Sequence, residues 1–176
     1  VAVTFCPLCN TALVFERFSF EGELLTFGTS GNLRNSDLVM YDRQTESWWQ
    51  QFTGEGIVGY FTDTILTPVA AAIVSWDDFK ASHPEGMVLS RETGFSRSYG
   101  QNPYVGYDNI NSFPFLFDGN LDDQLKPMER VIGVVLENDA SVAYTLGRLS
   151  AEEVINDTLD DTALAVFWKS GTASAL

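Results

Sequence analysis

The chain is short of the residues on which most catalytic and metal sites depend. Its 176 residues include two cysteines and a single histidine, His83. One histidine excludes most His-dependent catalysis by a single chain. Two cysteines three positions apart exclude a framework of several disulfides. No apolar run approaches the roughly 18 residues that a membrane-spanning helix needs, so we expect no direct membrane insertion by this segment.

Positive charge is also scarce. The chain has 10 Lys plus Arg against 24 Asp plus Glu, a formal net charge of −14 at pH 7. Such a surface repels phosphate backbones, which excludes nucleic acid as a partner. The acids are scattered along the chain and not gathered in blocks, as is typical of a solvated surface.

The residues that are present predict a globular, mainly β fold. Hydrophobic residues make up 45% of the chain and aromatic residues 13%, enough for a sizeable core in one domain over residues 1–176. Short runs of alternating polarity separated by turns predict an antiparallel or mixed β-barrel or sandwich. The expected strands are Val1–Phe5, Ala12–Phe20, Leu24–Gly28, Leu38–Tyr41, Ser47–Phe52, Ile57–Phe61, Ile65–Ile73, Arg130–Leu136 and Ser141–Leu146.

Two short helices and a long aromatic loop interrupt the strands. Ser75 begins a helix that Pro84 and Gly86 stop after Ser82, and the capping box Ser150-Ala-Glu-Glu153 opens a helix that ends near Asn156. Residues 95–125, rich in Gly, Asn and Pro, predict an ordered loop fixed by buried aromatic rings. The rings expected to be buried are Tyr99, Tyr104, Tyr107, Phe113, Phe115 and Phe117.

An internal echo joins the two ends of the chain. Ala163–Ala175 resembles Val1–Leu13: each is an apolar strand followed by a turn of small or polar residues. The later copy has Trp168 and Gly171 where the earlier one has Cys6 and Cys9. This pattern predicts a duplicated β unit in which one copy carries the thiols.

Cys6 and Cys9 are the strongest chemical signal. The residues after Cys9 alternate as in a strand, which disfavours a thioredoxin-type site at a helix N-terminus. Zinc would need carboxylates or another chain to complete four ligands. Copper(I) is satisfied by two thiolates, to which Met40 or Met128 can add a thioether. A structural turn, reduced or closed by a Cys6–Cys9 disulfide, is the remaining alternative.

Other polar residues offer weaker signals. Arg91, Arg97 and Tyr99 can line a ligand pocket with the aromatic loop, although the arginine side chains can instead fix the loop through carbonyl groups. Asp42 and Thr45 lie on a turn, where such side chains bond the local backbone. Trp48 and Trp49 should point to opposite faces of a strand, one into the core and one toward solvent.

Several blocks together resemble a known family, the bacterial and archaeal domain-of-unknown-function family 3179. They are Cys6-Pro-Leu-Cys-Asn-Thr-Ala-Leu13, Leu25-Thr-Phe-Gly-Thr-Ser-Gly-Asn-Leu-Arg-Asn-Ser-Asp-Leu-Val-Met-Tyr-Asp-Arg-Gln-Thr45, Trp49-Gln-Gln51, Phe95-Ser-Arg-Ser-Tyr99 and Asn102-Pro-Tyr-Val-Gly-Tyr107. The resemblance implies longer proteins with export or anchor sequences, hence an extracytoplasmic location. It also implies an upstream segment containing a His-bearing helix, and a chain that starts at Val1 is expected to be processed or partial.

Three functions fit these observations. The first is an extracytoplasmic β-rich domain that binds a soft metal ion, copper or zinc, or acts as a redox point through Cys6 and Cys9. The second is an enzyme with a pocket between the Cys turn and the Arg/Tyr loop. The third is a structural subunit, either of a homo-oligomer or of an assembly with another partner.

Overall fold

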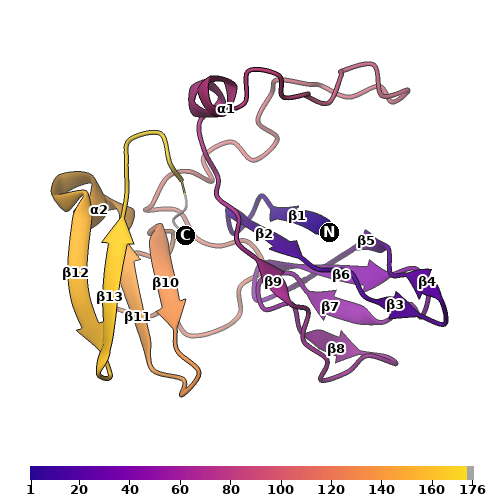
Figure 1. Cartoon of the computed structure of the whole chain (residues 1–176), viewed down its shortest axis with the longest axis horizontal. Helices are drawn as coiled ribbons and strands as arrows, with labels where there is room; N and C mark the ends of the chain where they lie inside the picture. The colour runs from indigo at the N-terminus through magenta and orange to yellow at the C-terminus, as the bar shows by residue number, and fades with distance from the viewer. Residues whose placement is uncertain (174–176) are drawn as a thin grey trace. The chain divides into compact units, whose positions relative to one another are not determined.

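The computed structural model describes residues 1–173, and these group into two compact units. Unit 1 contains residues 1–71 and 107–129, and unit 2 contains residues 72–106 and those from 130 onward. The organisation as one domain stays a prediction. The prediction of a mainly β fold with two short helices is confirmed (Figure 1).

Unit 1 contains a three-stranded sheet, a four-stranded sheet and a short hairpin, all antiparallel. The three-stranded sheet has the order β1-β2-β9, the four-stranded sheet the order β5-β6-β7-β8, and the hairpin pairs β3 with β4. The strands are β1 (Ala2–Cys6), β2 (Thr11–Phe15), β3 (Ser19–Phe20), β4 (Glu23–Leu24), β5 (Phe27–Arg34), β6 (Asp37–Asp42), β7 (Trp48–Gln50), β8 (Gly56–Val58) and β9 (Pro68–Val69).

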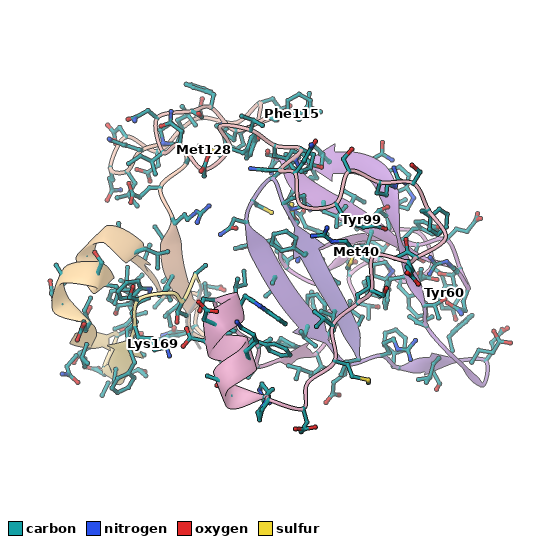
Figure 2. The ribbon with its side chains drawn as sticks, turned by 90° about the horizontal axis from the view of Figure 1, so that it is seen from above. Met40, Tyr60, Tyr99, Phe115, Met128 and Lys169 are labelled. Carbon is teal, nitrogen blue, oxygen red and sulfur yellow. The ribbon has the colours of Figure 1, made fainter. Side chains whose placement is uncertain are left out.

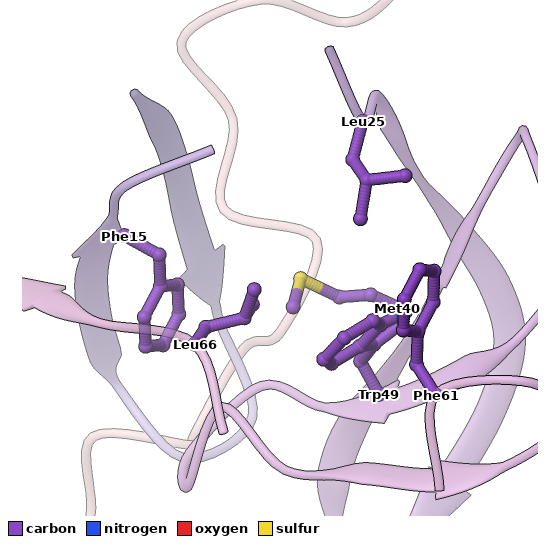
Figure 3. Close-up of a cluster of buried hydrophobic side chains, with 6 residues drawn as sticks. All are labelled: Phe15, Leu25, Met40, Trp49, Phe61 and Leu66. Carbon is purple, nitrogen blue, oxygen red and sulfur yellow. The ribbon is translucent and has the colours of Figure 1, made fainter. Parts of the chain in front are cut away.

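The core of unit 1 draws side chains from both of its larger sheets (Figure 3). Phe15 comes from β2, Met40 from β6 and Trp49 from β7, and Leu25, Phe61 and Leu66 complete the buried cluster. The sheets therefore pack in a sandwich-like manner through this cluster. No closed barrel forms among the described strands.

Unit 1 contains a fully buried carboxylate. Asp42 has no exposed surface. Its carboxylate accepts from the backbone N–H of Thr45 at 2.6 Å, from the Thr45 hydroxyl at 2.9 Å and from Trp49 Nε1 at 2.9 Å. The predicted local bonding of Asp42 and Thr45 is thus confirmed, with the Trp49 indole as an added donor.

Unit 2 contains two antiparallel hairpins and both helices. Its elements are α1 (Trp76–Ser82), β10 (Val131–Val135), β11 (Ser141–Thr145), α2 (Leu146–Glu152), β12 (Val154–Leu159) and β13 (Thr162–Phe167). Tyr144, Leu149, Ile155 and Val166 form its buried core. No helix within residues 1–173 combines the length and apolarity required to cross a membrane.

The predicted start of the first helix is confirmed, and that of the second helix is wrong. The Ser75 side chain caps α1 by accepting from Asp78 N, as predicted, and His83 ends the helix. The predicted start of the second helix at Ser150 is wrong, because Thr145 caps α2 by accepting from Arg148 N. Ser150 lies inside α2, where its hydroxyl donates to Gly147 O at 2.8 Å. The sequence contained two cap-like residues, and the strand β11 ends at the earlier one.

The aromatic loop is irregular, as expected, but the predicted burial of its rings is wrong for most of them. Tyr99, Tyr104, Phe113 and Phe115 are exposed by 40%, 38%, 69% and 55%. Figure 2 shows Tyr99 and Phe115 on segments without regular structure. Residues of the strands, of α2 and of short connections such as Leu66 fill both cores, so apolar area alone did not determine which rings are buried.

The echo between the chain ends has a structural counterpart within the described residues. β1 and β13 share the same alternation of exposed and covered side chains, with Phe5 and Phe167 both exposed. After β13, a turn leads to Thr172, which forms an isolated bridge with Val74. Ser174 and Ala175, the end of the echo, lie outside the described residues.

We expect Tyr144 to make the stability of unit 2 depend on pH in the alkaline range. Burial raises the pKa of its phenol, and the hydrogen bond to Asp157 Oδ2 at 3.0 Å raises the pKa further. Below about pH 10 both folded and unfolded chains keep the proton, but above it the unfolded chain loses the proton first. The stability advantage over Tyr144→Phe should therefore shrink as the pH rises above about 10. Urea unfolding of both proteins at pH values on either side of 10 measures this, and an unchanged difference would contradict it.

Candidate metal centre

The cysteines occupy the turn of the β1–β2 hairpin. Cys6 pairs with Thr11 across the hairpin, and Cys9 lies between these two residues. Asn10 has a φ of 50°, which asparagine tolerates better than most residues, and the Thr11 hydroxyl donates to Cys9 O at 3.1 Å. The thiols are therefore held by a turn between strands and not by a helix N-terminus, as the alternation after Cys9 predicted.

A second hairpin brings a carboxylate to the thiols. Arg34 pairs with Asp37, and the two residues between them, Asn35 and Ser36, have φ values of 51° and 67°. Positive φ at both central residues is typical of a tight two-residue hairpin turn. It places Asp37, only 5% exposed, with Oδ1 3.1 Å from Cys9 Sγ. Its other oxygen accepts from Phe52 N at 2.9 Å.

The three side chains form a compact donor set. The Cys6 and Cys9 sulfurs and an Asp37 oxygen all lie within 4.8 Å of one another. A tetrahedral zinc ion with Zn–S bonds of about 2.3 Å places its thiolates about 3.8 Å apart. That spacing lies within the 4.8 Å limit on the distances between these donors.

Gln51 fixes the Cys hairpin against β6. It has no exposed surface. Its Nε2 donates to Thr4 Oγ1 at 2.9 Å and to Thr11 O at 3.2 Å, on both sides of the Cys turn. Its backbone N–H donates to Leu38 O at 2.9 Å, next to Asp37. One glutamine thus positions the thiol-bearing and carboxylate-bearing elements relative to each other.

The two thiols titrate very differently. The hydrogen bond from Cys9 lowers the pKa of Cys6 to about 7, against the opposing effect of burial. The same hydrogen bond, followed by burial and by the bond to Asp37, raises the pKa of Cys9. Cys6, whose thiol has the lowered pKa, is buried. Cys9 is exposed, although its hydrogen bond to Asp37 is partly buried. This is the reverse of what thiol–disulfide exchange favours, which is an accessible thiolate.

Both cysteines are free thiols in this structure. The Cys6–Cys9 disulfide stays a prediction about the oxidised protein. Met40, expected as an added thioether ligand, instead packs in the hydrophobic core of unit 1 (Figure 3).

The Arg/Tyr residues belong to unit 2. Arg91, Arg97 and Tyr99 are all exposed. The Tyr99 hydroxyl lies 2.5 Å from that of Thr93, and Tyr99 N donates to Arg97 O at 2.9 Å. These contacts order the loop locally, and the ligand site on these residues and its pocket toward the Cys turn stay predictions.

Asp37 and Gln51 were not predicted as site residues from the sequence. Asp37 is 28 residues from Cys9, so no local spacing connects them. The available signal was an acid between the Asn-Ser turn and a strongly apolar strand, where a carboxylate is buried and needs a partner. Gln51 gave a similar signal, since it follows the buried residue Trp49 by two positions in a strand-like run.

Comparison with known proteins gives one match. A family model described as "Protein of unknown function (DUF3179)" matches residues 1–176. Searches of curated proteins and of solved structures gave no match.

Proposed function

Since the chain belongs to the DUF3179 family, whose description assigns no activity, we propose from geometry that it binds a zinc ion through Cys6, Cys9 and Asp37. The observation that carries the proposal is the Asp37 carboxylate beside two thiols, with all three donor atoms within 4.8 Å. The sequence alone offered zinc no ligands beyond the two thiolates, and Asp37 supplies one carboxylate.

The donor chemistry favours zinc over copper(I). Two thiolates suit both ions, but a carboxylate oxygen is a hard ligand that zinc accepts and copper(I) does not prefer. Three protein ligands leave a fourth tetrahedral position for water or an incoming ligand, the pattern of open and not of closed structural zinc sites. A metal also explains the buried, thiolate-prone Cys6 better than redox exchange does.

The extracytoplasmic location remains part of this proposal. In an oxidising compartment two neighbouring thiols would form a disulfide. A bound metal ion occupies both thiolates and protects them from oxidation, so a reduced pair and such a location are compatible.

Metal analysis of the purified, reduced chain tests the proposal. We expect about one zinc per chain in the wild type and loss of that zinc in Cys6→Ser, Cys9→Ser and Asp37→Asn. Asp37→Asn is the sharpest variant, because its amide oxygen can still accept from Phe52 N. The exposed Asp108→Asn, also in unit 1, is the matched carboxylate control and should keep the metal.

Cobalt substitution identifies the ligands. Cobalt(II) bound to both thiolates should give a sulfur-to-metal charge-transfer absorption, which falls by about half when one thiolate is lost. Wild-type protein that is folded by circular dichroism yet binds neither zinc nor cobalt would overturn the proposal. Undiminished zinc in both cysteine variants would do the same.

A further inference from the structure

A groove of about 490 Å³ runs along the four-stranded sheet of unit 1. Val39 and Trp48 line it, whereas their neighbours Met40 and Trp49 belong to the core. Side chains alternate between the two faces of a sheet. The groove therefore lies on the face of β5–β8 that points away from the core.

The backbone of the outer strands is shaped around this groove. The β5–β6 register shifts between Thr29 and Leu33, and the β7–β8 register shifts between Trp48 and Trp49. Such bulges bend a strand and increase its twist, and they are over-represented beside functional sites. Gly31, in the first bulge, has a φ of 81° and open space on its side-chain side. Both outer pairs of this sheet thus depart from regular pairing where the groove lies.

Trp48 gives the groove an aromatic surface. Its side chain is 38% exposed, while that of the adjacent Trp49 is fully buried. The predicted division of the two tryptophans between solvent and core is therefore confirmed. An exposed indole in a groove offers a flat apolar face with a polar edge, a surface suited to a ligand with both kinds of group.

Polar groups of both signs surround this aromatic face. Arg34 Nη1 donates to Gln50 Oε1 at 2.8 Å and lies 3.9 Å from Glu55 Oε2. Asp63 and Asn32 line the same groove and are exposed. Two carboxylates disfavour an anionic ligand, and the groove offers acceptors on Glu55 and Asp63 beside donors on Arg34 and Asn32. A neutral ligand whose hydroxyl groups both donate and accept hydrogen bonds fits this set.

We propose that this groove binds a neutral pyranose saccharide. The apolar C–H face of the sugar ring lies on Trp48, and its hydroxyl groups donate to Glu55 and Asp63 and accept from Arg34 and Asn32. The ligand chemistry follows from an aromatic face surrounded by donors and acceptors in one groove. This site is separate from the Cys6, Cys9 and Asp37 donor set, and neither proposal requires the other.

Ligand-observed NMR tests the proposal with four probes, the methyl glycosides of glucose, galactose, mannose and N-acetylglucosamine. A ligand of this size in an open groove should bind with a Kd of about 1 mM. We expect saturation transfer to at least one glycoside, strongest at the ring protons that lie on the indole. Trp48→Ala should weaken that binding about tenfold or more. No transfer to any of the four would overturn the proposal.

Matched variants separate recognition from folding. Trp76→Ala removes another exposed tryptophan, on α1 of unit 2, and should leave glycoside binding unchanged. Asp63→Asn keeps the shape and the tolerance for a φ of 67°, and should weaken binding severalfold without unfolding the chain. Equal binding by wild type, Trp48→Ala and Asp63→Asn would refute the site, whereas zinc content should be the same in all three.

Discussion

Replacing Asp42 with alanine should lower the free energy of unfolding by about 2–6 kcal/mol, because it leaves one buried and one part-buried donor without an acceptor at about 1–3 kcal/mol each. Those donors are the backbone N–H of Thr45 and Trp49 Nε1, at 2.6 and 2.9 Å from the carboxylate. The Thr45 hydroxyl loses its acceptor as well. Trp49 and Asp42 are both fully buried, so water does not replace the bond to Trp49 Nε1 without a rearrangement of the core.

Chemical denaturation measures this effect, with Asp108→Ala as the exposed control. The control should change stability by no more than about 0.5 kcal/mol. Asp42→Asn should fall between the two, since it retains one oxygen but turns an amide N–H₂ toward a group that also donates. A loss for Asp42→Ala as small as that of the control would show that the buried carboxylate does not stabilise the fold.

Local patterns predicted the elements whose partners are near in sequence. The β10–β11 hairpin, the Ser75 cap of α1 and the turn made by Asp42 and Thr45 all depend on groups within a few residues. Trp48 and Trp49 were correctly assigned to opposite faces because strand alternation alone determines this. The interactions that produce these features lie within a short stretch of sequence.

The candidate metal centre depends on contacts that no short stretch contains. Cys6 and Cys9 could be recognised by their spacing, but Asp37 reaches them only because the Asn35-Ser36 turn and the Gln51 hydrogen bonds bring two hairpins together. The predicted burial of the aromatic rings in the loop was wrong for a related reason. Burial of Phe113 or Phe115 depends on whether strand residues leave room in a core, and residue type does not report this.

Zinc affinity should depend steeply on pH, with a change of slope near neutrality. Both thiols must lose their protons to bind the metal. The pKa of Cys9 is raised, so binding displaces one proton from it across the accessible range, and affinity falls about tenfold for each pH unit lost. Cys6, with a pKa of about 7, is already largely a thiolate above that value. Below it Cys6 must also release a proton, and the fall steepens to about 100-fold per unit.

Competition with a chelating indicator at about pH 6, 7 and 8 measures these slopes, and calorimetry in buffers of different ionisation enthalpy counts the protons released. We expect about one proton per zinc at the highest pH and about two at the lowest. A pH-independent affinity would mean that the thiols are not the ligands. A single slope of one throughout would mean that the hydrogen bond from Cys9 lowers the pKa of Cys6 well below 7, which keeps Cys6 a thiolate over the whole range.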